Sequence, residues 1–348
     1  MSFEQQSASD VLARLKTDLA TTDNTATTVE GSFNADILTA NSIEFGQTYN
    51  EMNLMIEAAF AGTSWGDYLT MRAAEFGVIR KEATAAVVDL KVTGTSGAAI
   101  IKGSLFATAE DLRFHTLTDT TVGSAGTVTV KAQCESTGID GNVAAGRIVK
   151  IPYSIPGIAA VTNEAAATDG YSQETDTELL ARYLLKVRTP ATSGNTYHYQ
   201  QWALSVAGVG QVKILPLWNG NGTVKVIIVD SNNATASDVL IKAVAGYIET
   251  VRPIGATVTV TSPTPLAVNI KADAVGMADI DKIKAAVNEY FKNSGFGLLA
   301  ISIARIGKIL LDSGISDYSN LTINEQAINL VLADSQLPVC GEVVLNVY

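Results

Sequence analysis

The stretch from Gly170 to Gly222, GYSQETDTELLARYLLKVRTPATSGNTYHYQQWALSVAGVGQVKILPLWNGNG, decides most of the fold that the sequence predicts. Thr175 is followed three residues later by Glu178, which is the pattern of a capping box at the start of a helix. Asp176 adds negative charge near the positive end of that helix. Apolar residues then recur at helical spacing through Leu179–Val187, and a proline follows. We therefore expect a helix that begins after Thr175 and ends before this proline.

A second helix is predicted directly after the first. The cluster Ser193–Asn195 is typical of a turn, and it can cap the helix that follows. Apolar and aromatic residues then fall on one helical stripe: Tyr199, Trp202, Ala203 and Val206. Gly208–Gly210 ends this helix and leads into a strand. The order of elements in this part of the chain is therefore helix, helix and strand.

A tight connection joins that strand to the next one. Trp218 and Asn219–Gly222 predict a hairpin-type turn, because asparagine and glycine tolerate a positive φ. A strand over Thr223–Asp230 follows at once. We expect both Trp202 and Trp218 to anchor the core and not to serve as contact points for a partner.

The composition excludes several classes of protein. Of the 348 residues, 47% are hydrophobic and 17% are charged, so most of the chain is expected to fold. The formal net charge of -11 argues against a nucleic-acid partner, because a phosphate backbone requires a basic surface. The longest apolar runs are too short for membrane insertion. The first ten residues, MSFEQQSASD, lack the pattern of a secretory signal.

The sequence predicts an α+β multidomain protein with four regions. A helical N-terminal region precedes a small all-β module rich in Thr, Val and Gly, and two α+β units follow toward the C-terminus. The four regions are residues 1–80, 81–168, 169–262 and 263–348. In the last region an alternating strand begins near Leu266, and the two α+β units share a similar layout.

Two apolar faces are predicted in the N-terminal region. One is formed by Val11, Leu12, Leu15 and Leu19, and the other by Met52, Met55, Ala59 and Phe60. Short amphipathic helices rarely stand alone, so these helices pack either against partner helices or back on their own domain. The sequence does not distinguish these two arrangements.

Residues with catalytic chemistry are sparse. The chain has two histidines, His115 and His198, and we expect structural or surface roles for both. The two cysteines, Cys134 and Cys340, lie far apart in the sequence and are expected in the core of a reduced protein. No spacing of His, Cys and carboxylates suggests a metal site, and no glycine-rich loop suggests a phosphate site. We expect no catalytic residue, no metal and no cofactor.

Two other functions remain open at this point. Adjacent carboxylates, Glu110-Asp111 and the pair Glu174 and Asp176, could serve glycoside hydrolysis, although roles in loops and helix caps also explain them. The β-rich region with its many polar Thr and Asn residues would also suit a carbohydrate-binding surface module. The absence of an export signal argues against the second alternative.

The chain resembles the baseplate J family, whose members form wedges in the baseplates of contractile phage tails. The resemblance extends from about Gly62 to Asp230 and includes glycine-punctuated segments of the β region: Ile101–Gly103, Gly138–Gly146, Val161–Asn163 and Thr168–Gly170. A further segment, Ala74–Arg80, resembles the family's boundary before that region. The positions that carry the family signature or a structural role are Gly170, Thr175, Asp176, Arg182, Ser193, Gly194, Asn195, Tyr199, Trp202, Gly208, Gly210 and Trp218.

This resemblance implies a structural protein of a phage tail, a defective prophage or a phage-tail-like bacteriocin. It implies that the chain pairs with another copy of itself within a wedge and that the wedges form a ring. The other implied partners are smaller wedge proteins, a central hub, sheath-proximal proteins and fibre-attachment proteins. The place implied is the baseplate of a virion or tail-like particle that assembles in the bacterial cytoplasm.

Overall fold

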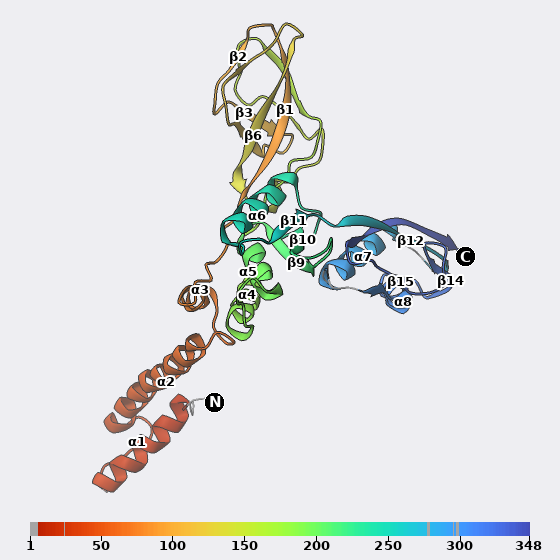
Figure 1. Cartoon of the computed structure of the whole chain (residues 1–348). Coiled ribbons are helices and arrows are strands. Elements are labelled where there is room, and N and C mark those ends of the chain that lie inside the picture. The colour runs from red at the N-terminus through yellow and green to blue at the C-terminus, as the bar shows by residue number, and fades with distance from the viewer. Residues whose placement is uncertain (1–5, 24, 277–278, 295, 297–298) are drawn as a thin grey trace. The chain divides into compact units, whose positions relative to one another are not determined.

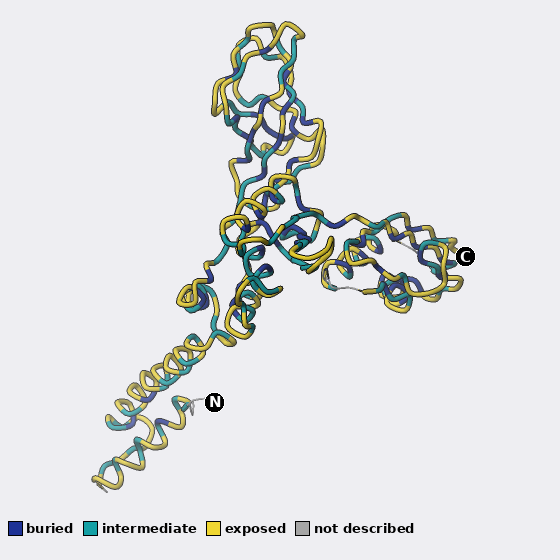
Figure 2. Tube along the Cα trace, in the orientation of Figure 1, coloured by how far each residue is buried: buried dark blue, intermediate teal, exposed yellow. Residues whose placement is uncertain are grey.

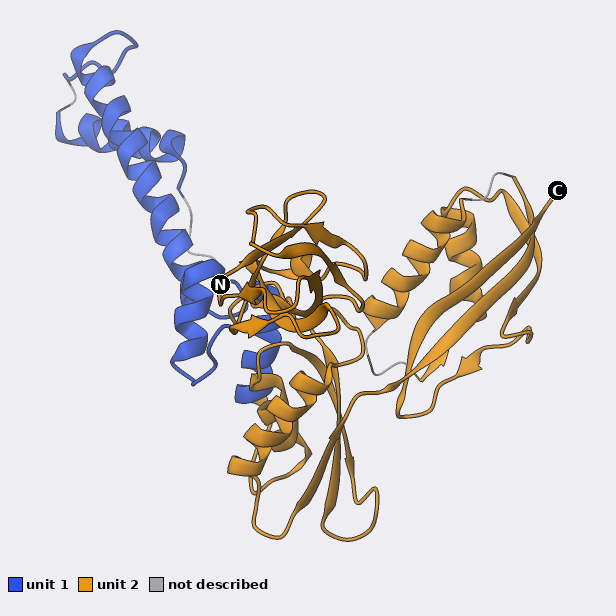
Figure 3. Ribbon diagram, turned by 90° about the horizontal axis from the view of Figure 1, so that it is seen from above, with its two compact units in different colours: residues 1–80, 175–187 blue, residues 81–174, 188–348 orange. Residues whose placement is uncertain are grey.

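The computed structural model describes residues 6–23, 25–276, 279–294, 296 and 299–348. It is a mixed α+β multidomain protein, as the sequence predicts, and it divides into two compact units (Figure 3). Unit 1 comprises Met1–Arg80 and Thr175–Val187, and unit 2 comprises Lys81–Glu174 and Arg188–Tyr348. Residues 1–5 lie outside the described residues, and they include half of the N-terminal segment that lacks the pattern of a secretory signal.

Unit 1 is helical. Its helices are α1 (Ala8–Thr22), α2 (Phe33–Ala59), α3 (Gly66–Ala74) and the part of α4 (Asp176–Arg188) that ends at Val187. Ser7 forms a capping box with Asp10 at the start of α1, and the Ser32 hydroxyl caps α2. The sequence predicted a helix only around Met52, whereas α2 runs for 27 residues.

Helices α1 and α2 form an antiparallel pair joined by a turn (Figure 1). They approach closely at Gly46, where an added Cβ would lie 3.0 Å from the backbone nitrogen of Ala8. A separate small core joins α3 to α4 and consists of Leu69, Ala73, Val78, Leu179 and Tyr183. The sequence predicts that α4 begins the third region, residues 169–262, and in the structure Thr175–Val187 belongs to unit 1.

Unit 2 begins with an all-β module. Its main sheet has the strand order β7-β3-β4-β6-β1-β8 and is antiparallel throughout. The two outer strands of this order also contact each other, so the sheet is nearly closed into a barrel. The strands are β1 (Ala85–Gly94), β3 (Leu105–Thr108), β4 (Arg113–Thr116), β6 (Thr127–Thr137), β7 (Ile148–Lys150) and β8 (Ile158–Asn163). A second sheet pairs β2 (Ala99–Ile100) with β5 (Thr120–Thr121), and a short 3-10 helix, η1, spans Ile139–Gly141.

The central domain of unit 2 contains a three-stranded sheet of order β11-β10-β9. Its elements are α5 (Thr196–Ser205), β9 (Val209–Pro216), β10 (Thr223–Asp230), α6 (Asp238–Val251) and β11 (Thr257–Thr261). The middle strand β10 pairs antiparallel with β9 and parallel with β11. It buries every residue from Val226 to Asp230, because both of its faces are covered.

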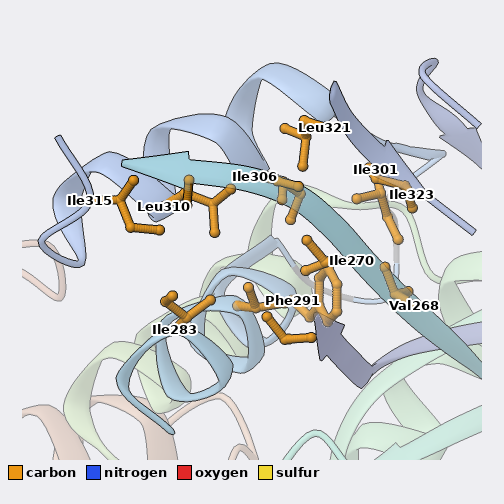
Figure 4. Close-up of a cluster of buried hydrophobic side chains, with 14 of the residues drawn as sticks. Val268, Ile270, Ile283, Phe291, Ile301, Ile306, Leu310, Ile315, Leu321 and Ile323 are labelled. Atoms are coloured by element: carbon orange, nitrogen blue, oxygen red, sulfur yellow. The ribbon is translucent and has the colours of Figure 1, made fainter. Parts of the chain in front are cut away.

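The C-terminal domain of unit 2 packs two helices on one sheet of order β14-β12-β16. Its elements are β12 (Thr264–Val275), α7 (Ile280–Ser294), β13 (Ala300–Ile301), α8 (Ile303–Asp312), β14 (Asp317–Ile323), β15 (Leu330–Val331) and β16 (Gln336–Val347). The expected alternation along β12 is confirmed, since Val268, Ile270, Ala272 and Ala274 are all buried. Figure 4 shows Val268 and Ile270 of this strand in one cluster with Phe291 of α7 and Leu310 of α8.

Burial differs sharply between these parts of the chain. In Figure 2 the strands of unit 2 alternate between buried and exposed positions, whereas α1 and α2 are exposed along most of their length. Helix α2 buries only Ala35 and Ser42. Among the described helices, α2 therefore carries the largest number of exposed large apolar side chains.

Candidate assembly surfaces and the signature segment

The signature segment begins with the predicted capping box, which the structure contains. The backbone nitrogen of Thr175 donates to Glu178 Oε2 at 3.0 Å, and the backbone nitrogen of Glu178 donates to Thr175 Oγ1 at 3.3 Å. These two bonds satisfy donors that the first turn of a helix otherwise leaves free. The start of α4 is therefore determined by local sequence.

Asp176 does more than add charge to the end of the helix. Its carboxylate accepts a hydrogen bond from the backbone nitrogen of Gly66 at 2.8 Å and forms a 2.6 Å ion pair with Arg80. The Gly66 bond and then the Arg80 guanidinium hold the pKa of Asp176 below its ordinary value. Arg182 of the same helix donates to the carbonyl of Ile79 at 2.8 Å. Asp176 and Arg182 thus bind α4 to the segment that contains α3.

The turn before α5 has the predicted form. Ser193 and Gly194 both adopt a positive φ, and the Asn195 side chain accepts a 2.9 Å hydrogen bond from the backbone nitrogen of His198. Gly194 lies against Pro253, and a Cβ at Gly194 would come within 2.3 Å of the proline ring. This turn therefore requires glycine both for its backbone conformation and for space.

The aromatic stripe of α5 is confirmed at Tyr199 and partly at Trp202. Tyr199 is 2% exposed, and burial raises the pKa of its hydroxyl. Trp202 is half-buried at the edge of the central core, where its ring meets Tyr199 edge to face at 5.0 Å and stacks on His198 at 4.1 Å. His198 also accepts a hydrogen bond from the backbone of Gly194. The expected structural role of this histidine agrees with these contacts.

Three signature glycines permit close approach in the central part of unit 2. A Cβ at Gly208 would lie 2.4 Å from the Tyr171 ring, and one at Gly210 would lie 2.2 Å from the carbonyl oxygen of Asp230. Gly170 is held between two hydrogen bonds with the side chain of Asn142, of 2.7 and 2.9 Å. At these positions the signature is a requirement for packing, not for chemistry.

The prediction for Trp218 is wrong. This side chain is 43% exposed at the β9–β10 connection, where the Lys225 ammonium lies 5.0 Å from the centroid of its ring. The turn also differs in detail from the prediction. The positive φ values fall on Leu217, Gly220 and Gly222, and not on the two asparagines. Sequence reasoning missed Leu217, because a leucine gives no local signal for a left-handed conformation.

The remaining candidates for chemistry have structural contacts. Cys134 is buried in the barrel core, and Cys340 is half-buried beside the core of the C-terminal domain. Glu174 is buried and accepts from the backbone nitrogen of Lys81, while Glu110 pairs with Arg147. Among the described residues no group of three or more His, Cys, Asp or Glu side chains is placed to hold a metal ion. Nor does any described helix have the length and apolar character needed to cross a membrane.

The most extensive apolar surface in unit 1 lies on α2 and the segment after it. Its large exposed side chains are Phe33, Ile37, Ile43, Phe45, Met52, Leu54, Met55, Phe60, Trp65 and Tyr68. A groove of about 530 Å³ opens at the end of this surface and is lined by Glu51, Leu54, Met55, Ala58, Ala59, Trp65 and Tyr68. Of the sequence-predicted faces, Met52, Met55 and Phe60 are exposed, and of the α1 stripe only Val11 is buried.

The first half of this α2 surface was missed by sequence reasoning. Phe33 and Ile37 are four residues apart and share one side of the helix, whereas Ile43 lies on another side, so the three form no single stripe with a 3.6-residue period. The Ser32 cap was the one local signal that could have located the helix start. A helix that is apolar on several sides requires more than one neighbour, and within unit 1 α2 packs on α1 and, at its end, on α3.

Comparison with known proteins identifies the family. Three family models match the chain: the baseplate J-like protein barrel domain over residues 89–170, the baseplate J-like central domain over 191–262, and the baseplate J-like protein C-terminal domain over 266–346. Phage-like element PBSX protein XkdT of Bacillus subtilis (strain 168) is 35% identical, and the match covers 98% of each chain. Baseplate protein gp47 of Escherichia phage Mu is 30% identical over 56% of this chain and 58% of that protein.

Among solved structures, a chain of the anti-feeding prophage baseplate aligns with 96% of this chain and 90% of its own length. Its TM-score is 0.43 and its sequence identity is 9%. The relationship rests instead on the three matched domains and on the relative that aligns end to end. The chain belongs to the baseplate J-like protein family.

Proposed function

We propose that this chain is a non-enzymatic structural subunit of the baseplate wedge of a contractile tail or tail-like particle. In this role it self-associates and joins smaller wedge, hub, sheath-proximal and fibre-attachment proteins. The proposal is supported by family membership and by the baseplate name of the Mu relative. The observation that carries it is the exposed apolar surface of α2.

The physical argument starts from the length and burial of α2. A 27-residue helix that buries only Ala35 and Ser42 in its own chain gains little from folding in isolation. Ile37 and Met55 lie about five helical turns apart and therefore share one face of α2. They are 46% and 71% exposed. Large apolar side chains exposed along one helix are typical of sites of protein association.

The described residues also favour a structural role over an enzymatic one. The signature positions form helix caps, turns and close backbone contacts. The two carboxylate pairs considered from the sequence are involved in ion pairs or backbone hydrogen bonds. These contacts stabilise the fold and so keep its surfaces well defined, as assembly with other proteins requires.

The test compares two lysine variants in the full chain. The double variant Ile37→Lys with Met55→Lys places charges on the α2 surface, and Val239→Lys is the control on α6, where Val239 is 63% exposed. We expect the wild type and the control to form dimers or larger assemblies in sedimentation velocity and to enter purified tail particles. The α2 variant should fold but remain monomeric. A wild-type chain that is monomeric and absent from the particles contradicts the proposal.

A further inference from the structure

Two turns at one end of the central domain display large apolar side chains to solvent. One turn joins β9 to β10 and carries Leu217 and Trp218, which are 62% and 43% exposed. The other joins α6 to β11 and carries Ile254, whose relative exposure is 105%. The two turns are neighbours, because the backbone nitrogen of Thr257 donates to the carbonyl of Gly222 at 2.8 Å. We call Leu217, Trp218 and Ile254 the central tip.

The first turn is held in an unfavourable conformation by several hydrogen bonds. Leu217 has a φ of 55°, which is unusual for a bulky side chain. Its backbone nitrogen donates to the carbonyl of Thr223 at 2.8 Å, and the Thr223 hydroxyl donates to the carbonyl of Gly220 at 2.6 Å. The surrounding hydrogen bonds maintain this backbone strain, and the strained turn exposes apolar side chains. A conformation of this kind indicates a function other than stability.

The second turn is held by Arg252. The guanidinium donates to the carbonyl of Ala256 at 2.5 Å and makes two bonds to the Glu249 carboxylate, of 2.6 and 2.7 Å. Pro253 restricts the backbone and packs on Gly194. Both turns of the central tip are therefore rigid before any partner arrives, which lowers the entropy lost on binding.

We propose that the central tip inserts into an apolar cleft with an acidic rim on another protein of the particle. Lys225 supplies the positive charge, since its ammonium lies 5.0 Å from the centre of the Trp218 ring. Among the described residues Lys225 forms no salt bridge, whereas Arg252 is already paired with Glu249. Acidic residues at the rim of the cleft would pair with this ammonium group. Tryptophan is among the residues that contribute most of the binding energy at protein interfaces.

Other occupants fit the central tip less well. An anionic membrane surface attracts clusters of basic residues, but the tip offers one unpaired lysine on a chain of net charge -11. A sugar would stack on the Trp218 ring and leave Leu217 and Ile254 without an apolar counterpart. A protein cleft accommodates all three side chains at once.

This inference rests on the proposed function, because it names one contact of the subunit within the particle. The test replaces Trp218, and separately Ile254, with photoreactive benzoylphenylalanine in the full chain and illuminates purified particles. Tyr153 of the barrel module, which is 64% exposed, is the control position. We expect cross-links from positions 218 and 254 to one other protein, at a segment with apolar residues flanked by Asp or Glu. Position 153 should give no cross-link to that segment.

Particle incorporation provides a second readout. The double variant Trp218→Ser with Ile254→Ser should enter particles at least about 30-fold less than Tyr153→Ser, the effect of one strong interface contact. Its thermal unfolding should match that of the wild type, because the altered side chains are exposed. Lys225→Glu should also reduce incorporation.

The outcomes separate the two proposals. Wild-type chain that enters particles without a cross-link from 218 or 254 overturns the central tip and leaves the proposed function intact. Cross-links to lipid, to glycan or to a second copy of this chain overturn it as well. A wild-type chain that never enters particles instead contradicts the proposed function.

Discussion

Helices α2 and α8 use apolar residues in opposite ways. The ten-residue α8 buries Ile306, Gly307 and Leu310 in the core of the C-terminal domain. The 27-residue α2 buries two small residues and leaves a longer series of large apolar side chains exposed. The buried apolar residues of α8 therefore stabilise the fold of the C-terminal domain, whereas the large apolar side chains of α2 are exposed. Apolar content alone does not reveal which of these roles a helix has.

The strongest test of this difference truncates one large side chain in each helix. Leu310→Ala should lower the stability of the C-terminal domain by about 2–5 kcal/mol, because it leaves a cavity in a closed core. Met55→Ala should change stability by less than about 0.5 kcal/mol, since Met55 is 71% exposed. Chemical denaturation followed by residue-resolved hydrogen exchange measures both. Comparable losses in the two variants would show that α2 is buried in the free chain.

A second test asks whether the signature glycines, like the buried residues of α8, are needed for the stability of the fold. Gly210→Ala should destabilise the central domain by about 1–3 kcal/mol or more, because its Cβ would meet the backbone of Asp230 at 2.2 Å. Gly246→Ala, at an exposed position of α6, has no atom within 4 Å of its Cβ and should stabilise the same domain by roughly 0.5–1 kcal/mol. Thermal unfolding of the two variants should therefore shift in opposite directions. Equal shifts would be inconsistent with the close approach at Gly210.

Helix caps provide a third test. Asn195→Ala should cost about 1 kcal/mol, because the side chain caps α5 in the central domain. Ser32→Ala removes the equivalent cap from α2. Since few tertiary contacts support α2, we expect its first turns to fray, which hydrogen exchange will detect as local loss of protection, without an effect on global unfolding. If Ser32→Ala shifts the global transition, α2 folds cooperatively with the rest of the chain.

The smallest effect concerns two carboxylates that respond to pH with opposite signs. Burial raises the pKa of Asp230, with a smaller contribution from Asp169, against backbone hydrogen bonds that lower it. The stabilising contribution of a protonated Asp230 is present below its ordinary pKa and is lost as pH rises through the raised folded-state pKa. Asp230→Asn keeps an oxygen for the backbone donors of Asn232 and Ala234. The variant should therefore be as stable as the wild type, or more stable, at neutral pH.

Asp176 is the matched case. Its pKa is lowered by the Gly66 hydrogen bond and then by Arg80, so its contribution is present above its ordinary pKa and is lost as pH falls through the lowered folded-state pKa. Asp176→Asn should therefore destabilise unit 1 at neutral pH and have little effect in strong acid. Unfolding midpoints between pH 2 and pH 8 test both variants, and a shift of the same sign in both would contradict the assignment.

The sequence predicted those elements whose signals are local. The Thr175–Glu178 box located α4, Asn195 located α5, and the alternation at Val268 and Ile270 located β12. The resemblance to the baseplate J family depended in part on the first two of these segments. Each of these predictions depended on residues within a few positions of one another, where spacing translates directly into backbone geometry.

The features that the sequence could not predict depend on contacts distant in sequence or on surfaces. Asp176 binds Gly66, which lies 110 residues earlier, so no local pattern could assign α4 to the N-terminal helices. The exposure of Trp218 depends on a left-handed Leu217, which is stabilised by bonds across the turn and not by its own preference. The first half of the α2 surface was not predicted because its apolar residues lie on more than one side of the helix.

The barrel module has its two ends side by side. Thr84 and Tyr171 exchange backbone hydrogen bonds of 2.9 and 3.3 Å, and Val87 and Thr168 pair in the same way. Residues paired across antiparallel strands lie about 5.5 Å apart, so a short hairpin turn could replace the whole barrel. Recombination at this point would exchange one module for another without altering the path of the chain on either side. We therefore expect the barrel to be exchangeable as a unit at this pair of strands.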